Sequence, residues 1–253
     1  MGALTTAWIA ATAETDTTII SALNTLETDL TTYGLTAKIK ALYPMVGGTA
    51  AKHKFNFMDA RDLDAAFRLT FNGGWTHSST GALPNGTNAY ADTYFIPSTS
   101  GVGLNSSHLS YYSRTSSTTP TAIMGIYATI SIGNISTQQA LFPSYAGSLY
   151  FGVNAGEDSL TAVATNKFYL ASRVNSTQQS VYVNSTANTY TRNSAALPDI
   201  RMYIGALNNL GVAFYFNPRE CAFSSMGNGL TPTEAANFYT AVQAFQTTLS
   251  RQV

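Results

Sequence analysis

Pairs of carboxylates are the first chemistry to look for, because a glycoside hydrolase places two of them across the bond that it cleaves. Side chains that share one face of a β-strand alternate, so such a pair would read E-x-D-x-E, and no such run occurs. The segment FMDARDLDAAF instead brings Asp59, Asp62 and Asp64 beside Arg61 and Arg68. This pattern indicates a charged turn with ion pairs.

A further acidic pair, Glu157 and Asp158, lies within NAGEDS. Adjacent residues of a strand point to opposite faces of the sheet, so this pair favours a turn. We therefore expect a protein that is not an enzyme, with a polysaccharide depolymerase as the remote alternative.

Histidine and cysteine give no reason to expect a metal or a cofactor. His53, His77 and His108 lie far apart and have no Cys or Glu at a zinc-binding spacing. The chain also lacks a G-x-S-x-G elbow and a G-x-x-x-x-G-K-[ST] phosphate loop. Its one cysteine, Cys221, lies in an apolar run, so we expect a buried packing residue rather than a reactive thiol.

One loop-rich stretch, GGWTHSSTGALPNGTNAYADTYF, carries the side-chain types of a sugar site. Trp75 supplies an aromatic face, and His77, Asn85 and Asp92 supply hydrogen-bonding groups. These four residues are candidate glycan contacts. The alternative is that Trp75 is a buried anchor at the start of a β-sandwich.

The adjacent tyrosines Tyr111 and Tyr112 lie in the apolar run HLSYYSRT. On a strand, one ring must point inward and the other outward. We count both as candidate glycan contacts.

The charge balance of the 253 residues is even, with 13 basic and 13 acidic side chains. Bulk electrostatics therefore favours neither nucleic acid nor acidic substrates. Residues 38–54 hold only four lysines, which indicates a solvated face rather than a nucleic-acid-binding stripe. No run of 18 apolar residues occurs and the N-terminus lacks the pattern of a secretory signal, so we expect neither membrane insertion nor secretion.

The spacing of apolar residues predicts helices within residues 1–50. In DTTIISALNTLETDLTTY, apolar side chains recur at a 4-3-4-3 spacing, as in an amphipathic or coiled helix: Ile19, Leu23, Leu26, Leu30 and Tyr33. A short second helix is expected over residues 35–43, ended by Pro44. The first four apolar residues are a candidate oligomer or helix-packing interface. The segment either attaches and oligomerises the protein or packs on its own domain as a helical hairpin.

From about residue 54 the period changes to that of strands. Some ten short runs rich in Tyr, Phe, Val and Ile are separated by Gly, Asn, Pro and Ser, with no helix between them. This order excludes a parallel α/β sheet and predicts an antiparallel sandwich over residues 51–253. In KFYLASRV the alternation is clearest, with Phe168 and Leu170 on one face and Tyr169 and Ala171 on the other.

A capped amphipathic helix is predicted over residues 231–250. Thr231 is the N-cap, Pro232 suits the first helical position and Glu234 completes a capping box. Phe238, Val242 and Phe245 then fall on one apolar stripe. We expect this stripe to seal the sandwich, with packing against another subunit as the alternative.

The order of these pieces resembles a known family. The series FYLASRVNSTQQSVYVNSTANTY, RMYIGAL and ECAFSSMGNGLTPTEAANFY is similar to the C-terminal half of laminin-G-like, concanavalin A-like jelly-roll modules. The stretches DLDAAFRLTFNGGWTHSSTGALPNGTN and GLTPTEAANFYTAVQAFQTTL resemble bacteriophage virion proteins that carry this module. Ser185 replaces the usual turn glycine after YVN, and the calcium-binding Asp clusters of many members are missing.

This resemblance implies a structural protein of a phage particle, a head or tail fibre or decoration component, made in the bacterial cytoplasm and exposed on the virion. It further implies a homo-oligomer, a trimer being favoured, in contact with other virion proteins. The alternative function is a carbohydrate-binding module that recognises host surface polysaccharide.

Overall fold

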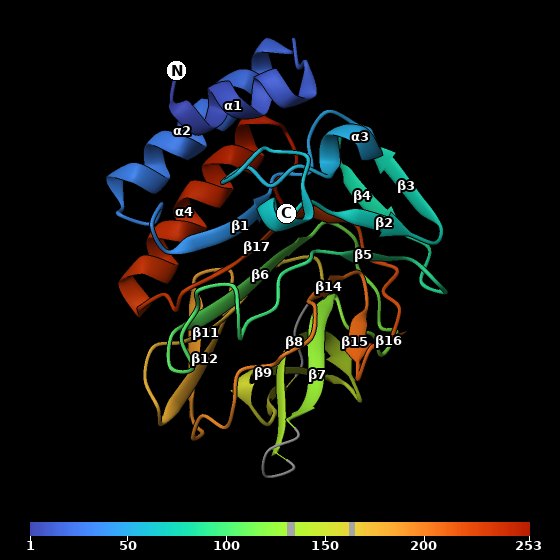
Figure 1. Ribbon diagram of the computed structural model, residues 1–253, viewed down its shortest axis with the longest axis vertical. Helices are drawn as coiled ribbons and strands as arrows, with labels where there is room; N and C mark the ends of the chain where they lie inside the picture. Colours follow the sequence, from blue (N-terminus) through green and yellow to red (C-terminus); the bar gives the residue numbers. More distant parts are fainter. Residues whose placement is uncertain (131–134, 162–164) are drawn as a thin grey trace.

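The computed structural model describes residues 1–130, 135–161 and 165–253. The protein consists of two stacked β-sheets, one of which is covered by helices (Figure 1). Every pairing among the described strands is antiparallel except that of β15 with β7. The predicted mainly β, antiparallel jelly-roll sandwich is confirmed. No described helix has the length and apolar composition needed to cross a membrane.

The eight-stranded sheet is the middle layer. Its strands, in spatial order, are β13 (Thr186–Thr191), β12 (Gln178–Val183), β11 (Phe168–Arg173), β6 (Ser107–Ser113), β17 (Cys221–Gly227), β4 (Gly81–Pro84) and β3 (Trp75–Ser78), with β1 (Ile39–Tyr43) also paired to β17.

The nine-stranded sheet is the outer layer. Its strands, in spatial order, are β10 (Asp158–Thr161), β9 (Ser148–Ala155), β8 (Ile135–Tyr145), β7 (Met124–Ile130), β14 (Tyr203–Ile204), β5 (Tyr90–Asp92) and β2 (Thr70–Asn72), with β15 (Leu207–Asn209) beside β7 and β16 (Val212–Phe214) beside β15.

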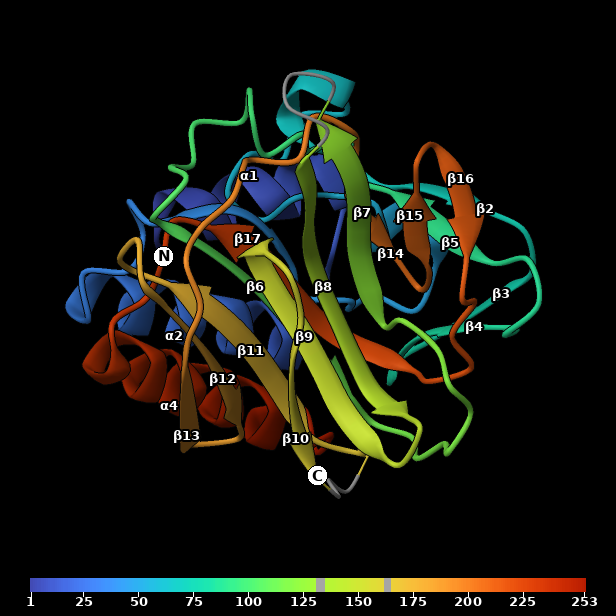
Figure 2. The same ribbon diagram turned by 90° about the horizontal axis from the view of Figure 1, so that it is seen from below.

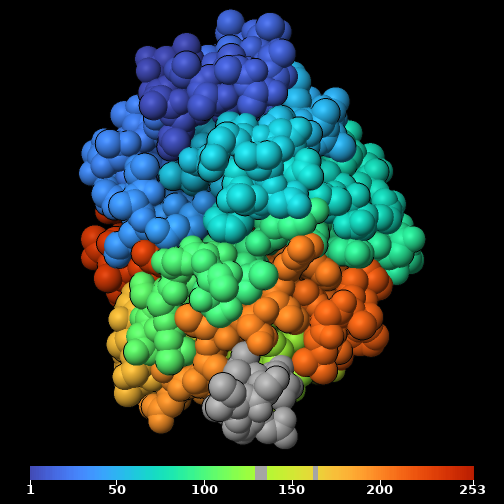
Figure 3. Space-filling view, viewed as in Figure 1, coloured from blue at the N-terminus to red at the C-terminus, as the bar shows by residue number. Residues whose placement is uncertain are grey.

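The helices form the third layer, on the outer face of the eight-stranded sheet (Figure 1). They are α1 (Ala3–Thr12), α2 (Thr17–Thr32), α3 (Ala50–His53) and α4 (Pro232–Thr248), with a 3-10 turn at Asp64–Ala66. The space-filling view shows the N-terminal residues lying directly against the rest of the molecule (Figure 3). The helix expected over residues 35–43 is wrong, because residues 39–43 pair with β17 as strand β1.

The central strands of the eight-stranded sheet, β11, β6 and β17, are therefore buried on both faces. The predicted alternation in β11 is confirmed, since Tyr169 and Ala171 enter the core between the sheets while Phe168 and Leu170 enter the core under the helices. Cys221 is buried as expected, and burial raises the pKa of its thiol to about 12. The eight-stranded sheet thus contributes one face to each of two hydrophobic cores.

Helix α4 begins at the predicted cap. Thr231 Oγ accepts from the Glu234 N–H, and the Glu234 carboxylate accepts from the Thr231 N–H at 2.8 Å. Lys38 adds an ion pair to Glu234 from the chain segment before β1. The capping box was fully readable from the sequence.

Replacing Thr231 with alanine is expected to lower the free energy of unfolding by about 1 kcal/mol, because an orphan helix N–H then loses its acceptor. Urea denaturation of both proteins measures the change. Thr233→Ala is the matched control, since Thr233 is exposed in the first turn and is not the cap. Equal stability of the two variants would contradict the capping role.

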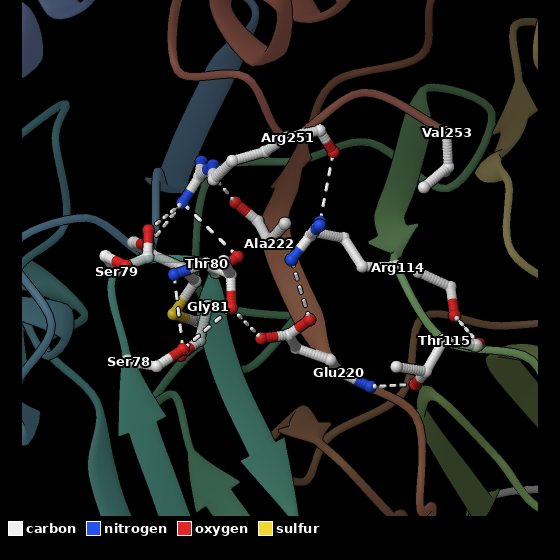
Figure 4. Close-up of polar contacts among 12 residues, drawn as sticks. Ser78, Ser79, Thr80, Gly81, Arg114, Thr115, Glu220, Ala222, Arg251 and Val253 are labelled. Carbon is white, nitrogen blue, oxygen red and sulfur yellow. Dashed lines mark hydrogen bonds and ion pairs between the residues drawn. The ribbon is translucent and has the colours of Figure 1, made fainter.

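The last residues of the chain are bound to the sheet by a buried arginine. Figure 4 shows the Arg251 guanidinium directed at the carbonyl of Ala222, 3.1 Å away, on β17. Arg114 lies between the Arg251 carbonyl, at 3.0 Å, and the Glu220 carboxylate, at 3.1 Å (Figure 4). Helix α4 is thus fixed at both ends.

Candidate functional site

Aromatic side chains gather on the outer face of the nine-stranded sheet. This face, with β7, β8 and β9 in front, is turned to the viewer in Figure 2, and the helices lie behind it. Five residues there line a cavity of about 90 Å³, which we call the aromatic hollow: Phe142, Tyr145, Tyr150, Glu157 and Tyr215.

The β8–β9 hairpin positions most of the hollow. Ala146 and Gly147 both have positive φ, 49° and 78°, as a two-residue hairpin turn of the primed type requires. This turn pairs Tyr145 with Ser148, and a register shift further along the hairpin places Phe142 opposite Tyr150. Phe142 and Tyr145 are three positions apart, which would place them on opposite faces of a regular strand. The register shift between these two positions allows both side chains to line the hollow.

The rings stand nearly perpendicular to one another. Tyr145 meets Tyr150 at 82° and Tyr215 at 86°, with centroid separations of 5.6 and 5.8 Å. Phe142 meets Tyr215 at 82°. Such edge-to-face packing is the favoured arrangement of aromatic quadrupoles, so the rings support each other. The hollow is therefore walled from several directions and is not a flat platform.

Polar groups reach the hollow from two of its tyrosines and from the turn between β9 and β10. The hydroxyl oxygens of Tyr145 and Tyr215 are 3.5 Å apart. The pKa of Tyr215 is raised, first by the hydrogen bond with Tyr145, then by burial, and further by the charges of Tyr145 and Glu157. Of the acidic pair predicted to lie in a turn, Glu157 does so, whereas Asp158 is the first residue of β10. These groups can accept and donate hydrogen bonds beside the aromatic rings.

The charge of the Glu157 carboxylate is not balanced locally. Among residues 1–130, 135–161 and 165–253, no cation forms an ion pair with it within 4 Å. The nearby Arg192 donates to the Glu157 backbone carbonyl at 2.8 Å, and its guanidinium is paired with Asp158 at 2.7 Å. The hollow therefore has a negative wall.

The candidate contacts Trp75 and His77 lie on β3, at an edge of the other sheet. Trp75 is half-buried, and its Nε1–H donates to the Asn72 carbonyl at 3.0 Å. A Cβ on Gly205 would lie 2.9 Å from the indole, so the ring fills a space that only glycine leaves open. The Nδ1 atoms of His77 and His53 are 2.9 Å apart. These contacts favour the alternative, an anchoring role for Trp75.

The other two members of this group also have partners within the protein. Asn85 is exposed, and its Oδ1 accepts from the N–H groups of the following turn. Asp92 is buried on β5 and paired with Arg201 at 3.0 Å. The structure therefore does not bring Asp92 and Trp75 to one sheet face, and as glycan contacts the four residues stay predictions.

The expectation that Tyr111 or Tyr112 contacts a glycan is wrong, because both rings are fully buried. The Tyr111 hydroxyl donates to the Arg219 carbonyl at 2.7 Å, between the sheets. The Tyr112 hydroxyl donates to Gln243 of α4 at 3.1 Å. The outward-facing ring does exist, but the helix layer covers it.

The residues predicted to form an oligomer or helix-packing interface pack against one another within this chain. Helices α2 and α4 contact each other, and one core under the helices contains six of the seven residues, with Ile19 packed at its margin: Leu23, Leu26, Leu30, Phe238, Val242 and Phe245. The stripe of α4 seals the sandwich, as expected. A role of residues 1–50 in attachment or oligomerisation stays a prediction.

The aromatic hollow was not found from the sequence. Its signal was the aromatic density of the runs LFPSYAGSLYF and FYF. The parts SLYF and FYF were interpreted only as strands, and LFPSY was assigned to no element. No group of three or more His, Cys, Asp or Glu side chains is placed to hold a metal in the part of the chain that the structure describes.

Comparisons with known proteins show the fold. No protein-family model matches this chain, and no curated protein matches its sequence. Domain 4 of AbnA, an extracellular arabinanase from Geobacillus stearothermophilus solved with arabinotriose, is similar in structure, with a TM-score of 0.52 and 15% identity over 80% of this chain and 98% of that domain. A Trypanosoma rangeli sialidase solved with sialic acid is similar with a TM-score of 0.51 and 13% identity over 79% of this chain. The match spans only 32% of the sialidase chain.

Proposed function

We propose that this protein is a carbohydrate-binding module whose contact surface is the aromatic hollow. The observation that carries the proposal is the group of four aromatic rings and one carboxylate around a cavity on the sheet face opposite the helices. Aromatic rings pack against the C–H faces of sugars, and phenol and carboxylate oxygens bind their hydroxyl groups. The complex of the similar arabinanase domain with arabinotriose supports the same class of ligand.

The size of the hollow limits how much of a glycan it can hold. Its volume of about 90 Å³ is below the roughly 300–1,000 Å³ of pockets that enclose a small molecule. The site would therefore hold one part of a chain whose remainder lies across the sheet surface. Such a contact suits a surface polysaccharide.

The proposal includes no catalysis. Asp59, Asp62 and Asp64 each form an ion pair with an arginine, so they are not free to act as an acid–base pair. Incubation of the protein with a polysaccharide that it binds is expected to release no reducing sugar. Sustained release of reducing ends would contradict this part of the proposal.

Replacing Tyr150 or Tyr215 with alanine is expected to weaken glycan binding at least tenfold, because each change removes one wall of the hollow. A glycan array that includes arabinotriose identifies a ligand, and isothermal titration calorimetry measures the change in Kd. Tyr203→Ala is the matched control, since Tyr203 is a half-buried tyrosine on β14 outside the hollow. Unchanged affinity of both hollow variants would reject the assigned site.

A place on a phage particle as an oligomeric fibre component is a second proposal. Its assembly part is favoured by the exposed apolar side chains Leu210, Val212 and Phe214 on the β15–β16 hairpin, which are 50–67% exposed. Light scattering after size-exclusion chromatography tests assembly. A monomer of 27.0 kDa at micromolar concentration would reject the homotrimer.

A further inference from the structure

The aromatic hollow combines three properties that together define a site for a positive charge: π walls in several directions, a small volume and an unbalanced carboxylate. We infer that it takes an ammonium or trimethylammonium group carried by the glycan, an inference that rests on the proposed glycan-binding function. An acidic sugar is disfavoured at the same place.

The orientation of the rings suits a compact group better than a flat one. A sugar ring stacks on one flat aromatic face, whereas adjacent rings here meet at 73–86°. Walls in different directions surround a roughly spherical group. The face of each aromatic ring carries the negative part of its quadrupole and attracts a cation within about 6 Å of the ring centre.

The volume of the hollow points to the same kind of group. At about 90 Å³ it is well below the roughly 300–1,000 Å³ of pockets that enclose a small molecule. A compact substituent of a glycan therefore suits it better than a whole glycan chain. The buried side chain of Phe142 supplies an apolar contact for the methyl groups.

The carboxylate of Glu157 supplies the charge complement. Arg192, the cation beside this turn, is already paired with Asp158. A cation in the hollow would neutralise Glu157 and gain the attraction of the rings, whereas a carboxylate of the ligand would meet repulsion. Glu157 is exposed, so water solvates its charge when a neutral sugar is bound, and only a cation gains the direct attraction.

The test uses choline chloride as the probe and 3,3-dimethylbutanol as its uncharged isostere, with binding followed by tyrosine fluorescence and calorimetry on the full chain. Choline is expected to bind saturably and at least tenfold more tightly than the isostere. Glu157→Gln is expected to weaken choline binding at least tenfold. Asp199→Asn, at an exposed carboxylate outside the hollow, is the matched control and is expected to change nothing.

Equal binding of choline and its isostere, or an unchanged choline affinity in Glu157→Gln, would overturn the inference. The array separates this failure from failure of the proposed function. If neutral glycans bind and Tyr150→Ala removes that binding while choline does not bind, the glycan function stands and the cation site is rejected. If choline binds and no glycan does, the cation site stands and the glycan function is rejected.

Discussion

Replacing Arg251 with alanine is expected to lower the free energy of unfolding by about 3 kcal/mol, because a hydrogen bond to a charged group contributes about 1.5–3 kcal/mol and several buried acceptors lose their donor together. The guanidinium is buried and donates to the carbonyls of Pro44, Met45 and Ala222 at 3.1, 2.8 and 3.1 Å, and to Gln246 Oε1 at 2.9 Å. Burial lowers the pKa of Arg251 to about 10, so the group is still charged at neutral pH. Its loss leaves several buried acceptors without a donor, and each costs free energy.

Urea denaturation at pH 7 measures this change. Arg251→Lys is expected to recover only part of the stability, because an ammonium group has three donors in a different geometry. Arg61→Ala is the control, since Arg61 is exposed and its ion pair within the described part of the chain is with the neighbouring Asp59. A loss below about 1 kcal/mol for Arg251→Ala would show that water replaces the guanidinium and that the C-terminal end is not held by it.

Acidification from pH 7 to pH 5 is expected to lower the free energy of unfolding by about 2 kcal/mol for each of two buried histidines. Burial lowers the pKa of His108 to about 4. Burial, and then the neighbouring His77 and Arg251, lowers the pKa of His53 to about 3. In the unfolded chain both groups titrate near 6.5, so below that pH the unfolded state binds protons that the folded state does not. Stability is therefore lost as the pH falls from about 6.5 towards the folded pKa.

The geometry explains why these two rings stay neutral. His108 Nδ1 lies 2.6 Å from the Asn228 carbonyl, which can only accept, so Nε2 is the acceptor for the Ser225 hydroxyl at 3.1 Å. The Nδ1 atoms of His53 and His77 face each other. A hydrogen bond between them requires that one Nδ1 atom carries a proton and the other does not.

Urea denaturation at pH 7, 6 and 5 tests this linkage, in a window above most carboxylate titrations. His108→Gln is expected to remove about half of the pH dependence, because glutamine offers a donor and an acceptor without titrating. A slope equal to that of the unmodified protein would contradict the assignment to His108.

The two ends of the fold differ in how far the sequence predicted them. Helix α4 was predictable because Thr231, Pro232 and Glu234 set its start by local geometry, and a single apolar stripe showed which side is buried. Strand β1 was not predictable, because a short apolar run such as IKALY is compatible with both a helix and a strand. Its pairing partner, β17, also lies more than 170 positions later in the sequence. Helix α1 was not predicted individually within residues 1–50, because the N–H groups of its first turn donate to the carboxylate of Glu27 on α2 rather than to a cap of its own.

The candidate site shows the same limit more sharply. Trp75 stood out because tryptophan is rare, yet the fold uses its indole as an internal contact with Asn72 and Gly205. Tyr150 and Tyr215 did not stand out, because tyrosine is common in this chain, with 15 residues. They form a site only because β9 and the segment after β16 lie on one sheet face.

The amino-acid sequence by itself determined the local features of this protein: the period-two strands, the apolar periods of α2 and α4, the capping box of α4, the turn at Glu157 and the charged turn near Asp62. Each of these depends on residues within a few positions of one another, so pattern and side-chain chemistry are enough. Only the tertiary structure decided which faces are covered. The helices bury Tyr112 on one sheet, and the other sheet collects the rings around Glu157, because strand order and layer stacking are set by contacts between distant segments.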